Sequence, residues 1–227
     1  MELIRGFISP RAARAILEIF RYQKINNING SIAEIGTYLG KTFIGLALAA
    51  NQGERVVGVD IFPEGIAEQL NESLRQHVPS GGPGTVHLLK MDSSIISTKQ
   101  WIELLEKPAR FVHIDGNHNH DAVLNDINLA SNFLADKSIV LIDDFLHDWY
   151  PDVTEGVLNA IRYSKNLRPV AVIPRSGPLT RGGSKLICST AESAEEYKKL
   201  IVNLFSEMRF RRINIAGYNA ITFMSAD

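Results

Sequence analysis

The sequence has almost no cysteine, no excess charge and no long apolar run. Its 227 residues include one cysteine, Cys188, which lies in an apolar run typical of a core. No disulfide can therefore form within the chain, and a reducing compartment such as the cytoplasm is expected. The 24 Lys and Arg balance 25 Asp and Glu, which gives no support for nucleic-acid binding. Neither a membrane span nor a signal peptide is visible, so we expect no membrane partner.

Short apolar segments of strand character alternate with helical segments along the chain. We expect strands at 32–35, 55–60, 85–90, 110–115, 138–143, 168–173 and 184–188, and helices at 10–25, 42–50, 65–77, 98–105, 121–134, 154–163 and 191–208, before a last β segment at 213–223. This alternation predicts right-handed crossovers and a mostly parallel sheet with helices on both faces. We therefore predict one α/β domain over residues 1–227 with a seven-stranded sheet, to which helix 10–25 and segment 191–227 are additions.

The stretch from Ser31 to Thr42 joins the first expected strand to a helix through a turn that contains Gly36 and Gly40. Such a unit brings backbone N–H groups close to a nucleotide-like ligand, although ligand-free turns share the pattern. The Gly-x-x-x-Gly spacing differs from the Gly-x-Gly-x-x-Gly of dinucleotide-binding folds. It therefore disfavours a nicotinamide-dependent oxidoreductase.

Acidic residues follow several of the expected strands, namely Asp60, Asp115 and the pair Asp143-Asp144. The carboxyl ends of parallel strands meet at one edge of a sheet, which is where open α/β sheets bind ligands. An isolated acid at such a place is commonly a loop cap. Several acids at one edge favour a binding site.

The ordered motifs resemble those of class I S-adenosylmethionine (SAM)-dependent methyltransferases, which implies a Rossmann-like fold. They are Ala33-Glu-Ile-Gly-Thr-Tyr-Leu-Gly40, Val57-Gly-Val-Asp60, Asp92-Ser93, His113-Ile-Asp-Gly-Asn-His118, Ile142-Asp-Asp-Phe145 and Val153-Thr-Glu-Gly-Val157. The branch with a His-Ile-Asp-Gly-Asp-His signature, which includes macrocin-type O-methyltransferases, is most similar, and the metal-dependent catechol-type enzymes are more distantly similar. The resemblance covers roughly residues 30–165. Asn117 stands where that branch usually has a second acid.

The resemblance implies which residues hold SAM. Asp60 would accept hydrogen bonds from the ribose hydroxyls, and Gly36 and Gly40 would let the backbone approach the cofactor without a Cβ in the way. The complete set of expected cofactor residues is Glu34, Gly36, Tyr38, Gly40, Thr42, Asp60, Asp92, Ser93 and Asp115.

The same motifs imply a catalytic group and a Mg²⁺ site. Asp115, Asp143 and Asp144 offer the carboxylate oxygens that Mg²⁺ prefers. Asp143 and Asp144 are neighbours, so the strand must turn if both are to reach one ion. Asp115 and His118 are the expected catalytic residues, and His118 suits deprotonation of a hydroxyl near neutral pH. The alternative is that His118 is a solvated loop residue, whereas His113 within a strand is expected in the core.

We thus expect an O-methyltransferase that transfers the methyl group of SAM to a hydroxyl of a small molecule with the help of Mg²⁺. The alternatives are a metal-independent N- or O-methyltransferase that uses His118, and a SAM-binding protein without catalysis.

Trp149, Tyr150 and Pro151 are candidates for the wall of an acceptor pocket. Loop 174–183 is either a cover over this edge or an ordinary exposed hairpin. The sequence leaves a homo-oligomer possible and the acceptor unnamed.

Overall fold

The computed structural model describes residues 4, 6, 8–79, 82–177 and 183–224. The helices are α1 (Pro10–Ile25), α2 (Lys41–Ala49), α3 (Ile66–His77), α4 (Thr98–Leu105), α5 (His120–Ser131), α6 (Pro151–Tyr163) and α7 (Ala194–Leu204), with a short 3₁₀ helix, η1 (Ser93–Ile95). The strands are β1 (Ser31–Ile35), β2 (Glu54–Asp60), β3 (Gly84–Lys90), β4 (Ala109–Ile114), β5 (Leu134–Phe145), β6 (Leu167–Ile173), β7 (Ser184–Thr190), β8 (Phe210–Ile215) and β9 (Tyr218–Phe223).

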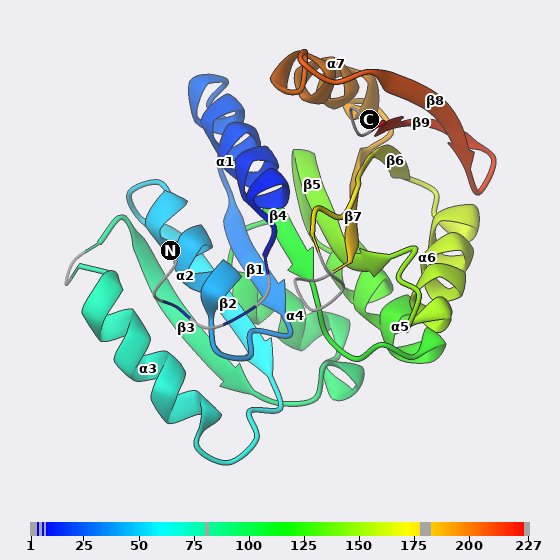
Figure 1. Ribbon diagram of the computed structural model, residues 1–227. Coiled ribbons are helices and arrows are strands. Elements are labelled where there is room, and N and C mark those ends of the chain that lie inside the picture. The colour runs from blue at the N-terminus through cyan, green and yellow to red at the C-terminus, as the bar shows by residue number, and fades with distance from the viewer. Residues whose placement is uncertain (1–3, 5, 7, 80–81, 178–182, 225–227) are drawn as a thin grey trace.

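The strands form one twisted sheet in the order β3-β2-β1-β4-β5-β7-β6-β9-β8 (Figure 1). Strand β7 runs antiparallel to β5 and β6, β8 runs antiparallel to β9, and the other neighbours are parallel. The predicted α/β fold with a mostly parallel sheet is confirmed. The predicted count of seven strands is too low, because the expected last segment 213–223 is a hairpin of two strands. Its turn lies at Ala216 and Gly217, which both have positive φ, as tight hairpins require.

Several element boundaries also differ from those expected. Helix α5 ends at Ser131 rather than 134, because Leu134 already pairs with Ala109 of β4 as the start of β5. Helix α6 begins at Pro151, three residues before the expected start, since proline is well suited to the first turn of a helix. Helix α7 is shorter at both ends than the expected 191–208. Half of the expected loop 174–183, residues 178–182, lies outside the described residues.

The helices form a layer on each face of the sheet (Figure 1). Alternate strand residues point to opposite faces, so Ile32 of β1 belongs to the core cluster that includes residues of α1, α2, α3 and α7, whereas Ala33 belongs to the cluster with α4, α5 and α6. Cys188 is fully buried in the second of these clusters, as expected, and burial raises its pKa above the usual value for a thiol. The acidic residues at the carboxyl ends of the strands, Asp60, Asp115, Asp143 and Asp144, belong to neither cluster and are free to form a site.

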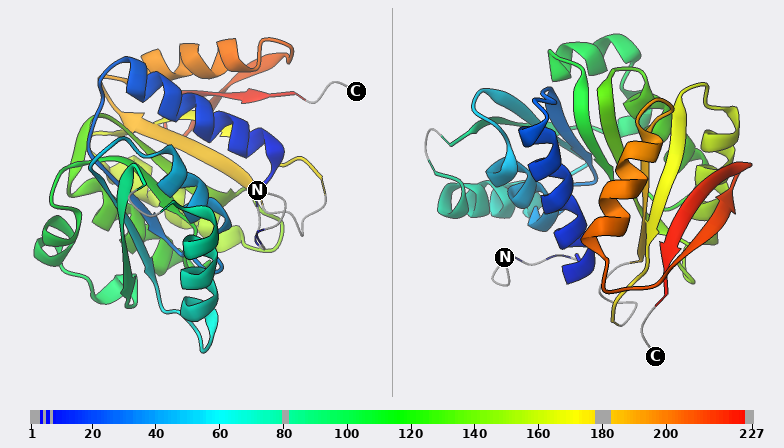
Figure 2. Two further views of the ribbon diagram at one scale, coloured as in Figure 1. Left: turned by 90° about the vertical axis from the view of Figure 1, so that its left-hand side faces the viewer. Right: turned by 90° about the horizontal axis from the view of Figure 1, so that it is seen from above.

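Helices α1 and α7 lie side by side although they are far apart in the sequence (Figure 2). Gln23 of α1 donates to the carbonyl of Arg110 at 2.9 Å and to the hydroxyl of Tyr197 at 3.2 Å. Arg110 in turn forms a buried ion pair with Glu54, 2.6 Å long. These contacts join both terminal additions to the start of β4, at the edge of the sheet away from the acidic strand ends. No helix in the described part of the chain is long and apolar enough to cross a membrane.

Candidate active site

A cavity of about 890 Å³ opens at the carboxyl ends of β1, β2, β4 and β5. This volume is near the upper end of the range for pockets that bind small molecules and cofactors. The expected site residues that line it are Gly36, Tyr38, Asp60, Asp92, Ser93, Asp115, His118, Asp143 and Asp144. Glu34, Gly40 and Thr42 do not line it.

Gly36 lies where β1 and β4 approach each other at the cavity. It has a φ of +88°, and a Cβ there would lie 1.9 Å from the carbonyl oxygen of Asp115. Gly40 also has positive φ, but its Cβ would collide with Leu70 of α3. The packing of α2 against α3 therefore requires a glycine at position 40, and its expected contact with the cofactor stays a prediction.

Asp60 ties the glycine turn to the end of β2. One carboxylate oxygen accepts from Tyr38 N at 2.8 Å and the other from Phe62 N at 2.7 Å. A carboxylate has about four acceptor positions, so each oxygen can accept another hydrogen bond from a ligand in the cavity. Asp60 thus caps the loops and also presents an acceptor pair to the cavity.

Asp92 begins the short helix η1 on the other side of the cavity. Its carboxylate accepts from Ser94 N at 2.9 Å, and hydrogen bonds from Ser94 lower the pKa of Asp92. The group is therefore an ionised acceptor next to the space that Asp60 borders.

Glu34 and His113 form a buried pair beneath the cavity. Glu34 Oε1 lies 2.7 Å from His113 Nδ1, and both side chains are at most 2% exposed. Burial, followed by the charge of Asp143, raises the pKa of Glu34 well above its usual value, and burial lowers the pKa of His113 to about 4. Both shifts favour the uncharged forms of the two side chains. Glu34 does not line the cavity and its observed partner is His113, so its expected contact with the cofactor stays a prediction.

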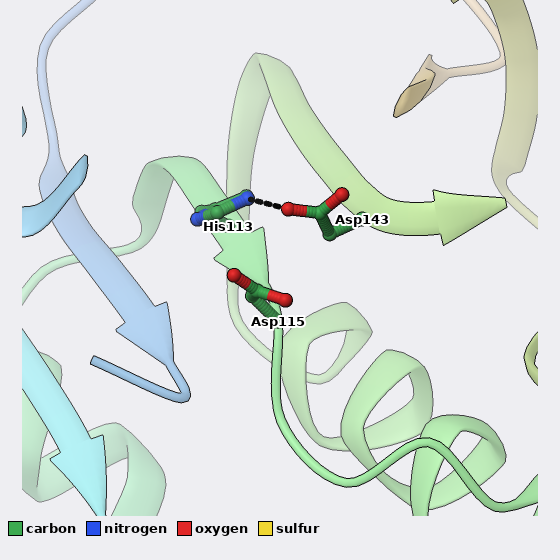
Figure 3. A group of neighbouring side chains, drawn as sticks. All are labelled: His113, Asp115 and Asp143. Atoms are coloured by element: carbon green, nitrogen blue, oxygen red, sulfur yellow. Dashed lines mark ion pairs between the residues drawn. The ribbon is translucent and has the colours of Figure 1, made fainter. Parts of the chain in front are cut away.

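Figure 3 shows how His113 and Asp143 point toward each other from β4 and β5, with Asp115 at the end of β4 beside them. His113 Nε2 lies 3.8 Å from Asp143 Oδ2. Burial and the charge of Asp143 raise the pKa of Asp115 well above its usual value. The close approach of these carboxyl groups therefore resists ionisation of all of them together.

A β-bulge brings both neighbouring acids to the same cavity. Ile142 pairs with Leu186 and Phe145 pairs with Ser184, so Asp143 and Asp144 together face the single residue between them on β7. Asp144 has a φ of +53°, which provides the turn that two adjacent residues need. Both side chains line the cavity, as the sequence required for a shared site.

The residue opposite the bulge is Lys185, which sequence reasoning missed. Its side chain is 3% exposed and its ammonium group forms an ion pair with Asp143. Although burial opposes the charge, Asp143 and Asp115 raise the pKa of Lys185 above its usual value. A lysine directly before the apolar run Leu186-Ile187-Cys188 of an expected strand is the signal that could have identified it.

His118 and Asp144 form a second pair at the mouth of the cavity. His118 Nε2 lies 2.9 Å from Asp144 Oδ2, and Gly183 N donates to Asp144 Oδ1 at 2.8 Å. Burial opposes the ionised form of Asp144, yet the hydrogen bonds from His118 and Gly183 lower its pKa. The His118 ring stacks on Tyr150, with centroids 4.1 Å apart. A histidine held by an ionised carboxylate in this way can act as a base.

The aromatic side of the cavity is formed by the segment before α6. Tyr150 and the half-exposed Trp149 line the cavity, and His147 packs between them, with ring centroids 4.8 and 5.4 Å away. Pro151 does not line the cavity. The expected acceptor wall therefore consists of rings that an organic molecule could contact.

The three expected metal ligands do not form one group. Among the described residues, Asp115 lies within 4.8 Å of possible ligand atoms of His113 and Asp143, or of His118 and Asp144. Asp143 is paired with Lys185, and Asp144 already accepts from Gly183 and His118. Asp143 is thus paired with a protein cation, and the three carboxylates do not together suit the octahedral oxygen shell of Mg²⁺.

Comparison with known proteins places this geometry in a family. Residues 33–145, about half of the chain, match a family described as a methyltransferase domain. No match was found among curated proteins. Similar solved structures include an O-methyltransferase from Bacillus cereus in complex with SAH (18% identity, 83% of this chain and 84% of that one, TM-score 0.61).

Two further similar structures are O-methyltransferases that take part in the synthesis of tomaymycin and of calicheamicin. TomG from Streptomyces achromogenes, involved in tomaymycin synthesis and solved with SAM, has 16% identity, 81% coverage of each chain and a TM-score of 0.60. CalS11, a TDP-rhamnose 3′-O-methyltransferase of calicheamicin biosynthesis, has 19% identity over 76% of this chain and 77% of that one, with a TM-score of 0.56. These structures share the fold, and the family match covers the segment that carries the motifs. The chain belongs to the class I SAM-dependent methyltransferases.

Proposed function

We propose that the protein transfers the methyl group of SAM to a hydroxyl group of a small molecule. The observation that carries the proposal is the His118–Asp144 pair, which lies in the same cavity as Asp60 and Asp92. One cavity thus offers acceptors for the cofactor and a base for the methyl acceptor. The proposal rests on this arrangement and on membership of the family.

The cofactor would occupy the side of the cavity bordered by β1, β2 and η1. Asp60 would accept hydrogen bonds from the ribose, and Asp92 with Ser93 would border the adenine. Tyr38, whose N–H is held by Asp60, and the backbone of Gly36 would contact the remaining part. SAM, when bound, supplies the electrophilic methyl group of a sulfonium cation, which suits a cavity lined with carboxylates.

The methyl acceptor would lie between the cofactor and the aromatic wall. His118 would take the proton of the attacking hydroxyl, and Asp144 would hold the imidazole and stabilise its charged form. Asp115 would orient the reactants by accepting a hydrogen bond from either one. The protein then contributes mainly the alignment of the oxygen with the methyl group.

A small organic acceptor fits the aromatic side chains of Trp149 and Tyr150. The printed names of TomG and CalS11 connect those proteins with small-molecule biosynthesis and support the same class of acceptor here. The expected Mg²⁺ has no role in this mechanism, because Asp143 is paired with Lys185. A metal held by Asp115, His118 and Asp144 is the competing arrangement, favoured by the closeness of their ligand atoms.

The test begins with calorimetric titration of S-adenosylhomocysteine (SAH) into the purified protein. Methyl transfer from radiolabelled SAM is then measured across a panel of phenols, polyols and amines. Saturable SAH binding with transfer to hydroxyl compounds is the expected result. Transfer to amines alone would contradict the O-methyltransferase assignment, and binding without transfer to any of a broad panel would favour the non-catalytic alternative.

A further inference from the structure

Lys185 occupies an unusual position for a lysine. It lies near the start of β7, and because β7 is antiparallel, that start lies at the edge where β4 and β5 end. Its side chain is 3% exposed and faces the two-residue bulge of β5. Apart from the ion pair with Asp143, the ammonium group has no hydrogen-bond partner among the described residues.

The carboxylates that line the cavity explain why a positive charge is needed beside them. Asp115, Asp143 and Asp144 all line the cavity, and no lysine or arginine lines it among the described residues. Carboxylates at this spacing repel one another and would become protonated or move apart without a positive partner. The ammonium group of Lys185 approaches from below the cavity floor and supplies that charge.

We propose that Lys185 is a built-in cation that holds Asp143 and Asp115 in place, in the position where a divalent ion was expected, so that the site works without a metal. The proposal deepens the proposed methyl transfer and rests on it. Lys185 is a positioning residue, since it reaches Asp143 and not the mouth of the cavity.

A divalent ion and Lys185 would compete for the same carboxylate. The side chain of Lys185 is 3% exposed, so moving it away from Asp143 would leave a buried charge without a partner. An ion bound to Asp143 would therefore face a fixed positive charge at close range, in surroundings that screen it poorly. This repulsion excludes tight binding of Mg²⁺ by the three carboxylates.

The experiment measures Mn²⁺ binding by electron paramagnetic resonance, which reports on the ion without any need for turnover. We expect the wild-type protein to bind no Mn²⁺ at millimolar concentrations. Lys185→Met removes the charge but keeps the length, and it should raise Mn²⁺ affinity by about tenfold or more. Adding Asp143→Asn to that variant should abolish the gain. The matched control is Lys198→Met, which removes a partly buried lysine from an ion pair with Glu195 on α7.

Stoichiometric Mn²⁺ binding by the wild type that is lost in Asp115→Asn would overturn the proposal, and so would a folded Lys185→Met variant without the gain. If Lys185→Met fails to fold, Lys185→Arg, which retains the charge, should still exclude Mn²⁺. With an acceptor in hand, wild-type turnover should persist in EDTA, and its loss would also overturn the proposal. Titration with SAH tests the proposed methyl transfer separately from the proposed role of Lys185. If the wild-type protein binds neither SAH nor Mn²⁺, the methyl-transfer proposal is refuted, whereas the exclusion of a metal by Lys185 is not.

Discussion

His118 Nε2 lies 2.9 Å from Asp144 Oδ2, and the imidazole is stacked on the ring of Tyr150. Two contacts thus hold the imidazole of His118: the carboxylate of Asp144 at its edge and the ring of Tyr150 against its face. The N–H of Gly183 completes the support of Asp144 from β7. A base that is already oriented loses little freedom when the reactants align, and this favours His118 as the proton acceptor.

Replacing His118 by alanine should lower turnover and leave the fold intact. General-base catalysis contributes roughly 10²–10⁴-fold to a rate, so we expect a loss of that size in kcat. SAH affinity should change little, because the cofactor contacts lie on the Asp60 side of the cavity. His77→Ala, at the end of α3 and outside the cavity, is the control. Full activity of His118→Ala in a radiolabel assay would remove His118 from the mechanism.

Replacing Asp60 by alanine should weaken SAH binding. Hydrogen bonds to a charged group contribute about 1.5–3 kcal/mol, which corresponds to roughly 10–100-fold in Kd. Some of that loss will come from the turn itself, because Asp60 also accepts from Tyr38 N and Phe62 N. Calorimetry measures the affinity, with thermal unfolding as a check on the fold. Asp136→Ala, at an exposed site on β5, is the control, and equal affinities of the two variants would refute the assignment of Asp60.

Replacing Gly36 by alanine should destabilise the protein and abolish SAH binding. The new Cβ would lie 1.9 Å from the carbonyl oxygen of Asp115, so β1 and β4 would have to separate. Gly53→Ala is a matched control, since Gly53 has a similar φ of +76° but open space around its Cβ position. That control should lose only the roughly 1–2 kcal/mol of a left-handed non-glycine residue. Similar melting temperatures of the two variants would show that the strand contact is not required.

Much of the fold could be predicted because strand and helix periods are local signals. Helix α1 and helix α4 have the predicted bounds, and the strands that carry the acidic ends lie where apolar runs predicted them. The β8–β9 hairpin was missed because its turn, Ala216-Gly217, lacks the usual asparagine or aspartate. The early start of β5 was missed because Leu134 also fits the helical pattern, and only pairing with β4 decides between them.

The residues that line the cavity could be predicted only where the end of a single strand determines their position. Asp60, Asp115 and His118 line the cavity because each directly follows a parallel strand or its turn. Gly40 and Glu34 were assigned to the cofactor by motif; neither lines the cavity, and their positions are explained by packing against Leu70 and pairing with His113. Lys185 could not be found in this way, because it comes from the start of an antiparallel strand.

Asp126 provides a test of the structure that does not depend on the acceptor. It lies on α5 beneath the turn at Gly116 and is 1% exposed, and Ser93 and Asn125 are the polar side chains near its carboxylate. Burial raises its pKa from 3.8 to about 6. The folded protein therefore favours the protonated form more than the unfolded chain does. The contribution of Asp126 to stability is complete below pH 3.8 and is lost as the pH rises through 6.

Asp126→Asn, which keeps the shape and removes the titration, should therefore stabilise the protein at pH 7 but not at pH 4. At 1.36 kcal/mol per pKa unit, the buried charge costs up to roughly 3 kcal/mol at pH 7. For a chain of this length the gain corresponds to roughly 6–12 °C in Tm. Thermal unfolding at the two pH values measures it, with Asp136→Asn at an exposed site as the control. A Tm difference between Asp126→Asn and wild type that is the same at both pH values would show that Asp126 is not a buried titrating carboxyl, since packing alone does not depend on pH.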